Sequence, residues 1–286
     1  MRALQRKKGN ESYYSLQHSF RKNGKVITKE KYLGKTPPKD IKTIKKTFLE
    51  ECQKMRLHNV FEKIGEGFRC EWQIYPKSMK EKIKEQIAIA FTYNTNAIEG
   101  SKITLGETRE LVEHKIAPNK TLDDVKETDA HAKVFLAMLN KKEAFNTRLI
   151  LKWHNELFQD TKPDIAGKFR EYRVSVGDYI APDWQDVVSL IHVMIKFYNE
   201  NPNRHPVELA ARMHYRFEKI HPFGDGNGRV GRLIINYVLW HSGYPILIIE
   251  YKKRKSYYKA LQKEEECFFN YFARRYLAAH KKYLAE

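Results

Sequence analysis

The chain has 286 residues, of which 42% are hydrophobic and 31% charged, and its formal net charge is +18. This composition argues against an intrinsically disordered protein and predicts a globular one with one large or two small domains. No signal peptide is visible, and the longest apolar stretch is interrupted by Asn236, His241 and Pro245, so we expect no membrane span. Three widely spaced cysteines indicate reduced thiols and favour a cytoplasmic protein.

The positive charge is concentrated at the ends of the chain. Residues 1–56 carry 16 Lys/Arg and 5 Asp/Glu (+11), residues 250–286 carry a net charge of +5, and the middle carries only +2. Basic ends of this kind suit a nucleic acid or another acidic partner. Solvated lysines that only improve solubility are the more common alternative, and composition does not separate the two.

The first 65 residues are predicted to form a small appendage. Residues 1–36 are expected to be a basic β-ribbon, because two extended runs flank Asn23-Gly24, a dipeptide that suits a two-residue hairpin turn. Pro37-Pro38 then breaks the chain. A tethering helix within residues 37–65 is indicated by apolar residues at three- and four-residue spacing: Ile41, Ile44, Phe48, Cys52 and Met55.

The body, residues 66–286, is expected to be mainly helical, and its first clear helix covers residues 79–99. Ser78 and Glu81 form a capping-box pattern at the start, and Gly100 ends the helix. Glu99 therefore lies at the negative end of the helix dipole, which costs about 0.3–1 kcal/mol unless a cation compensates. Glu99 either has an arginine partner or is simply exposed at a helix end.

The most informative stretch is HPFGDGNGRVGR, residues 221–232. Apolar residues at helical spacing precede and follow it, so it is predicted to be a tight turn between two helices. The stretch from Gly226 to Gly231 matches G-x-G-x-x-G, but a dinucleotide site needs a preceding strand, and the residues before Pro222 read as helix. We therefore reject a Rossmann site, and no Walker sequence is present.

Residues 221–232 match the Fic-family motif H-x-F-x-[DE]-G-N-G-R-x-x-R at every defined position, and the chain resembles that family. Thr95 to Gly100 is similar to the family's inhibitory motif [ST]-x-x-x-E-[GN]. Residues 166–182 are similar to its flap hairpin, and residues 254–261 to its closing helix. The resemblance covers about residues 66–280 and implies a mainly α, Fic-type helical domain with a flap β-hairpin.

The resemblance implies a protein adenylyltransferase, which transfers AMP from Mg·ATP to a hydroxyl side chain of a target protein. His221 would be the general base, because an imidazole accepts a proton near neutral pH. Asp225 would hold Mg²⁺, for which a carboxylate is a suitable ligand. The remaining expected site residues are Gly226, Asn227, Gly228, Arg229 and Arg232, which would bind the nucleotide phosphates, and Phe223, which would anchor the loop in the core.

By the same resemblance Glu99 would pair with Arg232 and inhibit the resting enzyme, with Thr95 and Gly100 completing the inhibitory motif. The target would dock on the flap, within Phe169 to Ile180, by β-augmentation. Whether the chain forms a homodimer stays open. Two alternatives remain: removal of AMP by the same site, and a nucleic-acid-binding regulator whose Fic body is vestigial. The intact motif argues against the second, and Gly228 argues against phosphate transfer, for which a relative carries lysine there.

Overall fold

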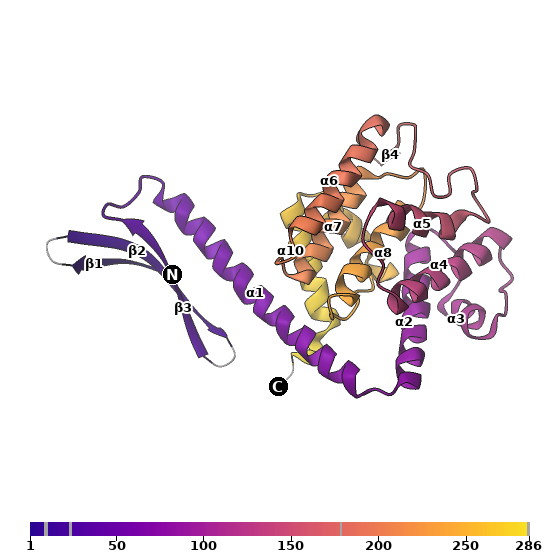
Figure 1. Ribbon diagram of the computed structural model, residues 1–286, viewed down its shortest axis with the longest axis horizontal. Helices are drawn as coiled ribbons and strands as arrows, with labels where there is room; N and C mark the ends of the chain where they lie inside the picture. The colour runs from indigo at the N-terminus through magenta and orange to yellow at the C-terminus, as the bar shows by residue number, and fades with distance from the viewer. Residues whose placement is uncertain (9–10, 23–24, 178, 285–286) are drawn as a thin grey trace. The chain divides into compact units, whose positions relative to one another are not determined.

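The computed structural model describes residues 1–8, 11–22, 25–177 and 179–284. The chain divides into two compact units, residues 1–66 and 67–285. Strands and most of one long helix make up the first unit, and helices make up most of the second (Figure 1). Among the helices of the described ranges, none combines the length and the apolar character needed to cross a membrane.

The first unit is built on a three-stranded antiparallel sheet of β1 (Arg2–Lys8), β2 (Glu11–Lys22) and β3 (Lys25–Gly34), in the order β1-β2-β3. The sequence predicted the β2 and β3 runs, and β1 adds a third strand to them. The predicted turn at Asn23-Gly24 lies outside the described residues, and Lys22 pairs with Lys25 on either side of it.

Helix α1 (Ile41–Ile74) covers one face of this sheet. Phe48 and Cys52 on α1 form a buried cluster with Leu16 of β2, whereas Met55, expected on the same stripe, is 37% exposed. The helix also continues past the expected end at residue 65. Its last turns belong to the second unit, where Phe68 and Trp72 pack against Trp240 with ring centroids 5.8 and 5.0 Å away. These tertiary contacts extend the helix.

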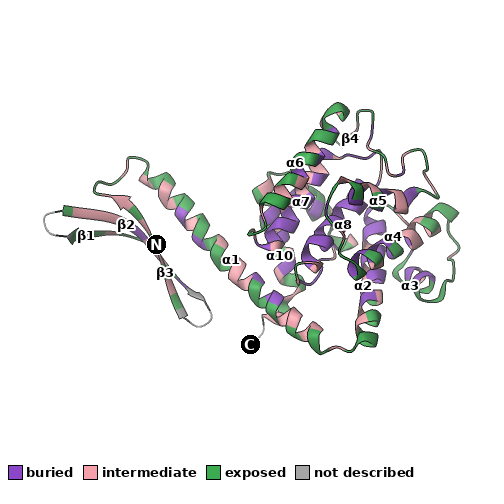
Figure 2. Ribbon diagram, viewed as in Figure 1, coloured by how far each residue is buried: buried purple, intermediate pink, exposed green. Residues whose placement is uncertain are grey.

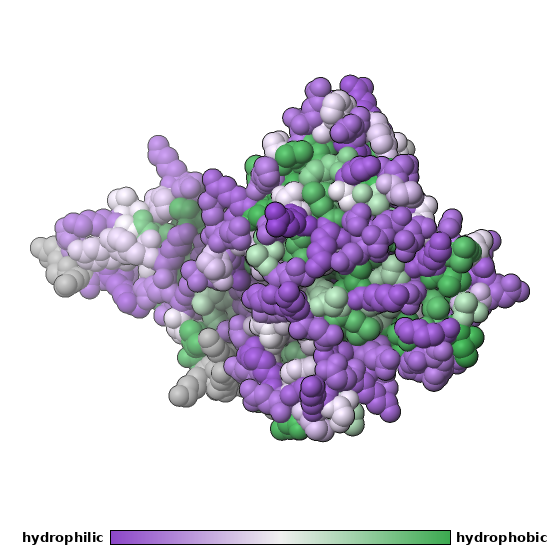
Figure 3. All heavy atoms as spheres, turned by 45° about the vertical axis from the view of Figure 1, so that its right-hand side comes forward, coloured by the Kyte–Doolittle hydropathy of each residue, from purple (hydrophilic) through white to green (hydrophobic). Residues whose placement is uncertain are grey.

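The second unit is mainly α, as the sequence predicted. Its helices are α2 (Lys77–Ile98), α3 (Leu105–His114), α4 (Leu122–Asn140), α5 (Thr147–Phe158), α6 (Val187–Glu200), α7 (Pro206–Ile220), α8 (Asn227–Trp240), α9 (Arg254–Leu261) and α10 (Glu265–Ala279). Helix α8 is buried along most of its length (Figure 2). Hydrophilic residues, in contrast, cover much of the surface seen in Figure 3. Because α8 is buried along most of its length, packing holds the residues at its N-terminus in position.

A short hairpin is the only β-structure described in this unit. Strands β4 (Ser175–Val176) and β5 (Tyr179–Ile180) pair antiparallel, within the segment predicted to be the flap. Val176 is 46% exposed and Ile180 is 76% exposed. The hairpin therefore presents apolar side chains to solvent.

The expected capping box at the start of α2 is wrong. The helix begins at Lys77 after an extended Pro76, and no side chain caps it. Glu81 instead accepts a hydrogen bond from Lys84 at 2.8 Å. The other end is as expected: Glu99 is the C-cap, and Gly100, with φ of 100°, takes a conformation that favours glycine and ends the helix.

Candidate active site

The loop between α7 and α8 places a histidine in a strained conformation. Helix α7 ends at Ile220, and its C-cap is His221, whose φ of 51° lies in the left-handed region. For a residue with a Cβ this region costs about 1–2 kcal/mol, and glycine is the usual choice at this helix position. The His221 N–H still closes the helix by donating to the Phe217 carbonyl at 2.9 Å. Strain at a non-glycine residue indicates a function for its side chain.

Arg170 holds this loop from the flap segment. Its buried guanidinium donates hydrogen bonds to the backbone carbonyls of His221, Tyr172 and Pro182 at 2.8, 2.7 and 2.7 Å. The backbone N–H of Arg170 donates to the Pro222 carbonyl at 2.9 Å. One side chain thus ties His221 to both ends of the segment that carries the flap. Arg170 was not predicted from the sequence, because only the fold brings these carbonyls together.

Phe223 anchors the loop in the core. It is fully buried and stacks on His154 of α5, with centroids 3.7 Å apart. The Nδ1 of His154 accepts from the Gly167 N–H, so its Nε2 carries the proton and donates to the Asp225 carbonyl, both at 3.0 Å. Burial lowers the pKa of His154 to about 4. His154 is therefore neutral at pH 7 and holds the loop by hydrogen bonds.

In this structure the Asn227 side chain is hydrogen-bonded within the loop. It was expected to donate to the phosphates, but its Oδ1 accepts from the Phe223 N–H and its Nδ2 donates to the Phe223 carbonyl, both at 2.9 Å. Asn227 is only 3% exposed. Both polar atoms of the amide are used within the loop, so the side chain shapes the turn.

We expect Asn227→Ala to lower the free energy of unfolding by about 2–4 kcal/mol, because it leaves a buried N–H and a buried carbonyl of Phe223 without partners. Urea unfolding measures this loss, and the exposed Asn119→Ala is the matched control. Unchanged stability together with a raised KM for ATP would instead make the Asn227 side chain a nucleotide ligand.

Two glycines allow close approaches at the start of α8. Gly226 has a φ of 77°, and a Cβ there would collide with the ring of Phe158. A Cβ at Gly228 would collide with the carboxylate of Glu99. No side chain caps the helix, so its first N–H groups have no side-chain acceptor at the cap. An uncapped helix N-terminus is a suitable site for an anion.

Arg232 and Glu99 form an ion pair, with 2.5 Å between Nη2 of Arg232 and Oε1 of Glu99. The same nitrogen lies 3.3 Å from the Thr95 carbonyl. Burial by itself would lower the pKa of Arg232, but the charge of Glu99 outweighs it and raises that pKa. Arg232 is 1% exposed, and its Nε and Nη1 have no hydrogen-bond partner among the described residues. The guanidinium is charged and has donors to spare.

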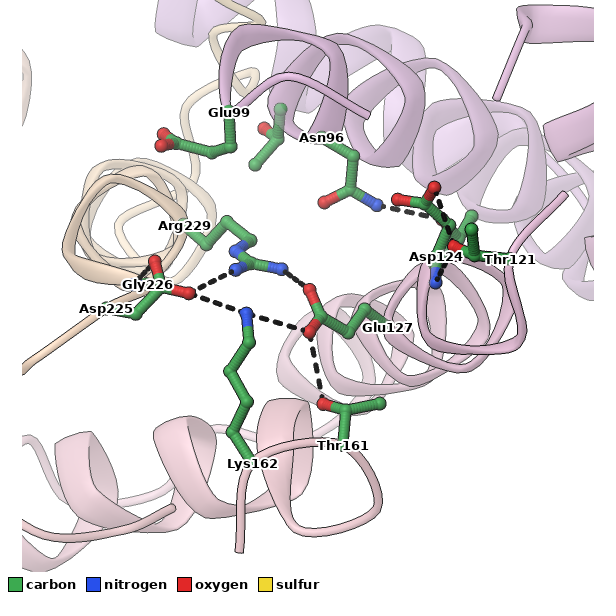
Figure 4. A network of polar contacts seen from close by, with 12 residues as sticks. Asn96, Glu99, Thr121, Asp124, Glu127, Thr161, Lys162, Asp225, Gly226 and Arg229 are labelled. Carbon is green, nitrogen blue, oxygen red and sulfur yellow. Dashed lines mark hydrogen bonds and ion pairs between the residues drawn. The ribbon is translucent and has the colours of Figure 1, made fainter. Parts of the chain in front are cut away.

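Arg229 belongs to a second charged cluster, which Figure 4 shows. Arg229 contacts Glu127 of α4 and lies 3.5 Å from Asp225. Lys162 bridges the same two carboxylates, at 3.1 Å from Glu127 and 2.6 Å from Asp225. Two cations thus alternate with two anions. Glu127 and Lys162 were not predicted from the sequence, because they lie far from the motif in the chain and carry no local pattern of their own.

Asp225 carries an ionised and partly exposed carboxylate. Burial alone would raise its pKa, but the hydrogen bond from Lys162 and the charge of Arg229 lower it. The carboxylate is therefore ionised at pH 7, and its side chain is 43% exposed. No group of three His, Cys, Asp or Glu able to hold a metal occurs among the described residues. Mg²⁺ needs only one or two carboxylates when phosphates and waters complete its shell, so this residue fits it.

A pocket of about 330 Å³ lies beside these charges. It is lined by Asn96, Glu99, Gly100, Ser101, Thr121, Asp123, Asp124, Glu127, Thr128, Lys162, Asp225 and Arg229. Residues at the end of α2 and residues of the loop motif thus meet at one pocket. The fold brings together Glu99, Asp225, Arg229 and Arg232 from elements far apart in sequence.

Known proteins match this part of the chain. Residues 144–239 match the model of the Fic/DOC family. The chain is 35% identical over 190 residues to protein adenylyltransferase Fic of Nematostella vectensis, a match that covers 64% of this chain and 44% of that protein. The protein of the same name from Drosophila ananassae is 34% identical over 189 residues, covering 64% and 38%. The chain thus spans less than half the length of these relatives.

Solved structures agree on the fold. Fic-1 from C. elegans matches with a TM-score of 0.70 and 25% identity, covering 84% of this chain and 74% of that chain. A Fic domain containing signaling protein from Bacteroides thetaiotaomicron matches with a TM-score of 0.65 and 24% identity, covering 78% and 97%. The motif, residues 221–232, lies within the residues that match the family model. The chain therefore carries a domain of the Fic/DOC family.

Proposed function

We propose that the chain transfers AMP from Mg·ATP to a hydroxyl side chain of a target protein, and that its resting state is self-inhibited. The observation that carries the proposal is the loop from His221 to Arg232, which gathers a base, a carboxylate, an uncapped helix N-terminus and two arginines. The relatives named protein adenylyltransferase support the same reaction.

In the proposed reaction the target's hydroxyl oxygen attacks the α-phosphorus of ATP. The bond from that phosphorus to the bridging oxygen breaks, and pyrophosphate leaves with the electron pair. His221 would take the hydroxyl proton. Burial lowers its pKa below the ordinary value, so the imidazole is neutral and able to accept a proton at pH 7.

Negative charge that develops on the phosphates would be met by the N-terminus of α8 and by Arg229 and Arg232. The spare donors of Arg232 support this role, because a phosphate oxygen would satisfy them. Mg²⁺ would be held by Asp225 and would supply charge neutralisation of the phosphates when bound. Lys162 then has to release Asp225, and the phosphates are the obvious new partner for its ammonium group.

Asp225→Ala is expected to weaken Mg·ATP binding about tenfold or more, since it removes the one carboxylate proposed as a metal ligand. Titration calorimetry with ATP, at high and zero Mg²⁺, measures this directly. Asp123→Ala is the matched control, because Asp123 lines the same pocket and carries the same charge. Equal losses in the two variants would point to a general effect of charge and not to a metal ligand.

Both motif arginines are paired with carboxylates in this structure, Arg232 with Glu99 and Arg229 with Glu127. We propose that the first pair inhibits the enzyme, since Glu99 and a γ-phosphate would compete for one guanidinium. Gly228 leaves the space that the Glu99 carboxylate occupies. Release of Glu99 from Arg232 would therefore be the activating step.

The target protein would dock on the β4–β5 hairpin by adding a strand to it. The exposed Val176 and Ile180 support a docking role, because they offer apolar contacts beside the backbone. Arg170 links both ends of the segment that carries this hairpin to the His221 carbonyl, so a docked chain would lie close to the base. A nucleic acid or another acidic partner would be a second ligand, held by the basic N-terminal residues.

Removal of AMP from a modified target is the alternative reaction for the same residues. In that reaction Glu99 would position a water for attack on the phosphorus, and the ion pair with Arg232 would orient its carboxylate. Substitution of Glu99 separates the two reactions. If the chain transfers AMP, the substitution should speed transfer, and if the chain removes AMP, it should slow AMP release.

A further inference from the structure

The first unit carries a surface that the proposed transfer does not use. Residues paired across antiparallel strands share a face of a sheet. Leu16 pairs with Ala3 and Lys31, and this face packs on α1 through Phe48 and Cys52. Gln17 pairs with Arg2 and Glu30 and belongs to the opposite face. Within its unit, α1 therefore leaves the second face uncovered.

This open face is formed by Arg2, Leu4 and Arg6 of β1, Glu11, Tyr13, Ser15, Gln17 and Ser19 of β2, and Val26, Thr28, Glu30 and Tyr32 of β3, with Lys35 following. Contacts along it confirm the assignment. Ser19 and Thr28 are hydrogen-bonded at 2.8 Å, and the rings of Tyr13 and Tyr32 are 6.2 Å apart. Arg6 donates to Glu30 at 3.1 Å.

The side chains of the open face are of the kinds that bind nucleic acid. The side chains of Arg6 and Lys35 are 61% and 60% exposed, and Tyr32 is 62% exposed. Arginine and lysine bind phosphates, whereas glutamine, serine and threonine donate to phosphates and base edges. Of the acids here, Glu30 binds Arg6 and Glu11 binds Lys35, so each is held by a cation.

Charge and size both fit a duplex. Residues 1–56 carry a net charge of +11, to which the open face contributes Arg2, Arg6 and Lys35 against Glu11 and Glu30. Three strands at about 4.8 Å spacing span roughly 10 Å, and the major groove of B-DNA is about 12 Å wide. Strands can read that groove directly. We propose that the open face of the β1–β2–β3 sheet binds duplex DNA in the major groove.

Fluorescence anisotropy with a labelled 20-base-pair DNA duplex tests this surface. The full chain carrying His221→Ala is used, so that no transfer reaction interferes. Binding should weaken steeply with salt. The triple variant Arg2→Ala, Arg6→Ala, Lys35→Ala should bind at least tenfold more weakly, and its log–log salt slope should be shallower by about 2.7, or about 0.9 for each phosphate that the protein no longer neutralises.

The control triple is Lys133→Ala, Lys196→Ala, Lys259→Ala, which removes the same charge from exposed positions of the second unit. It should stay within about twofold of the parent. Equal losses of affinity in the two triples overturn the proposal, because any cation would then serve. So does equal binding of duplex RNA, whose narrow major groove excludes a sheet. Binding of polyglutamate but not of DNA also overturns the proposal, and would identify an acidic protein as the ligand of this face.

The result does not depend on the proposed transfer. DNA binding is measured without ATP and on a variant without the proposed base. A chain that binds DNA but transfers nothing, and a chain that transfers AMP but binds no DNA, are therefore distinguishable outcomes.

Discussion

Glu99→Gly is expected to raise AMP transfer by about ten- to a hundredfold. The variant removes a carboxylate that lies 2.5 Å from Arg232. A hydrogen bond between charged groups contributes about 1.5–3 kcal/mol, and each 1.4 kcal/mol corresponds to a factor of ten. The freed guanidinium is buried and keeps its contact with the Thr95 carbonyl, so it would meet the γ-phosphate without searching for it. Incorporation of label from α-labelled ATP into the target measures the rate.

The matched control is Glu113→Gly. Its side chain is 27% exposed, close to the 29% of Glu99, and it lies at the end of α3 in the same body. Transfer by this variant should be unchanged. Stimulation by both variants would mean that a general loss of negative charge activates the enzyme and that the ion pair has no special role.

The double mutant Glu99→Gly, Arg232→Ala tests whether Glu99 inhibits through Arg232. If Glu99 inhibits only by holding Arg232, then Glu99→Gly should stimulate strongly in the wild-type chain and little once Arg232 is alanine. Additive effects would show that Glu99 acts in another way. Unchanged or reduced transfer by Glu99→Gly, together with slower release of AMP from a modified target, would establish the AMP-removing reaction instead.

His221→Ala should lower transfer by about a hundred- to ten-thousandfold while ATP binding stays nearly normal. General base catalysis contributes rate enhancements of this size, and the base acts on the incoming hydroxyl and not on the nucleotide. Alanine, like histidine, has a Cβ, so the variant keeps the same backbone strain at the φ of 51°. The comparison of the variant with the wild-type chain therefore reports the loss of the imidazole alone. The exposed His192→Ala serves as the control and should leave transfer unchanged. Near-normal transfer by His221→Ala would exclude this mechanism.

The pH profile gives a second test of the base. Burial lowers the pKa of His221, so its neutral form persists as the pH falls below the ordinary histidine value of about 6.5. Transfer should therefore hold between pH 7 and 6.5 and decline only at lower pH. A decline in transfer that begins above pH 7 would show that a group other than His221 sets the acidic limb of the profile.

Stability should also decline on acidification. In the unfolded chain His154 and His214 bind protons near pH 6.5, whereas burial lowers their pKa in the folded chain to about 4 and about 3. The unfolded state thus binds more protons below pH 6.5, so the free energy of unfolding falls through this range. The acid limb of activity has to be measured where circular dichroism shows the chain to be folded.

Residue type and spacing were enough to predict the helical class and the turn between two helices, whereas the roles of the loop residues came from the resemblance to the Fic family and stay predictions. Apolar residues at helical spacing on both sides of residues 221–232 identify a turn between helices, and that turn is where α7 ends and α8 begins. These are local properties, because capping, left-handed backbone and apolar spacing depend on neighbours in the chain. The position of Glu99 at a helix end was readable for the same reason.

The groups that meet these residues became known only from the folded chain. Arg170 collects three carbonyls, and Glu127 and Lys162 close the charged cluster around Asp225, all from segments far from the loop in sequence. Residue type alone did not show that the Asn227 amide is hydrogen-bonded to the backbone of Phe223. Hydrogen-bond partners depend on packing, and packing joins α4, α5, α7 and α8 across more than a hundred residues of chain.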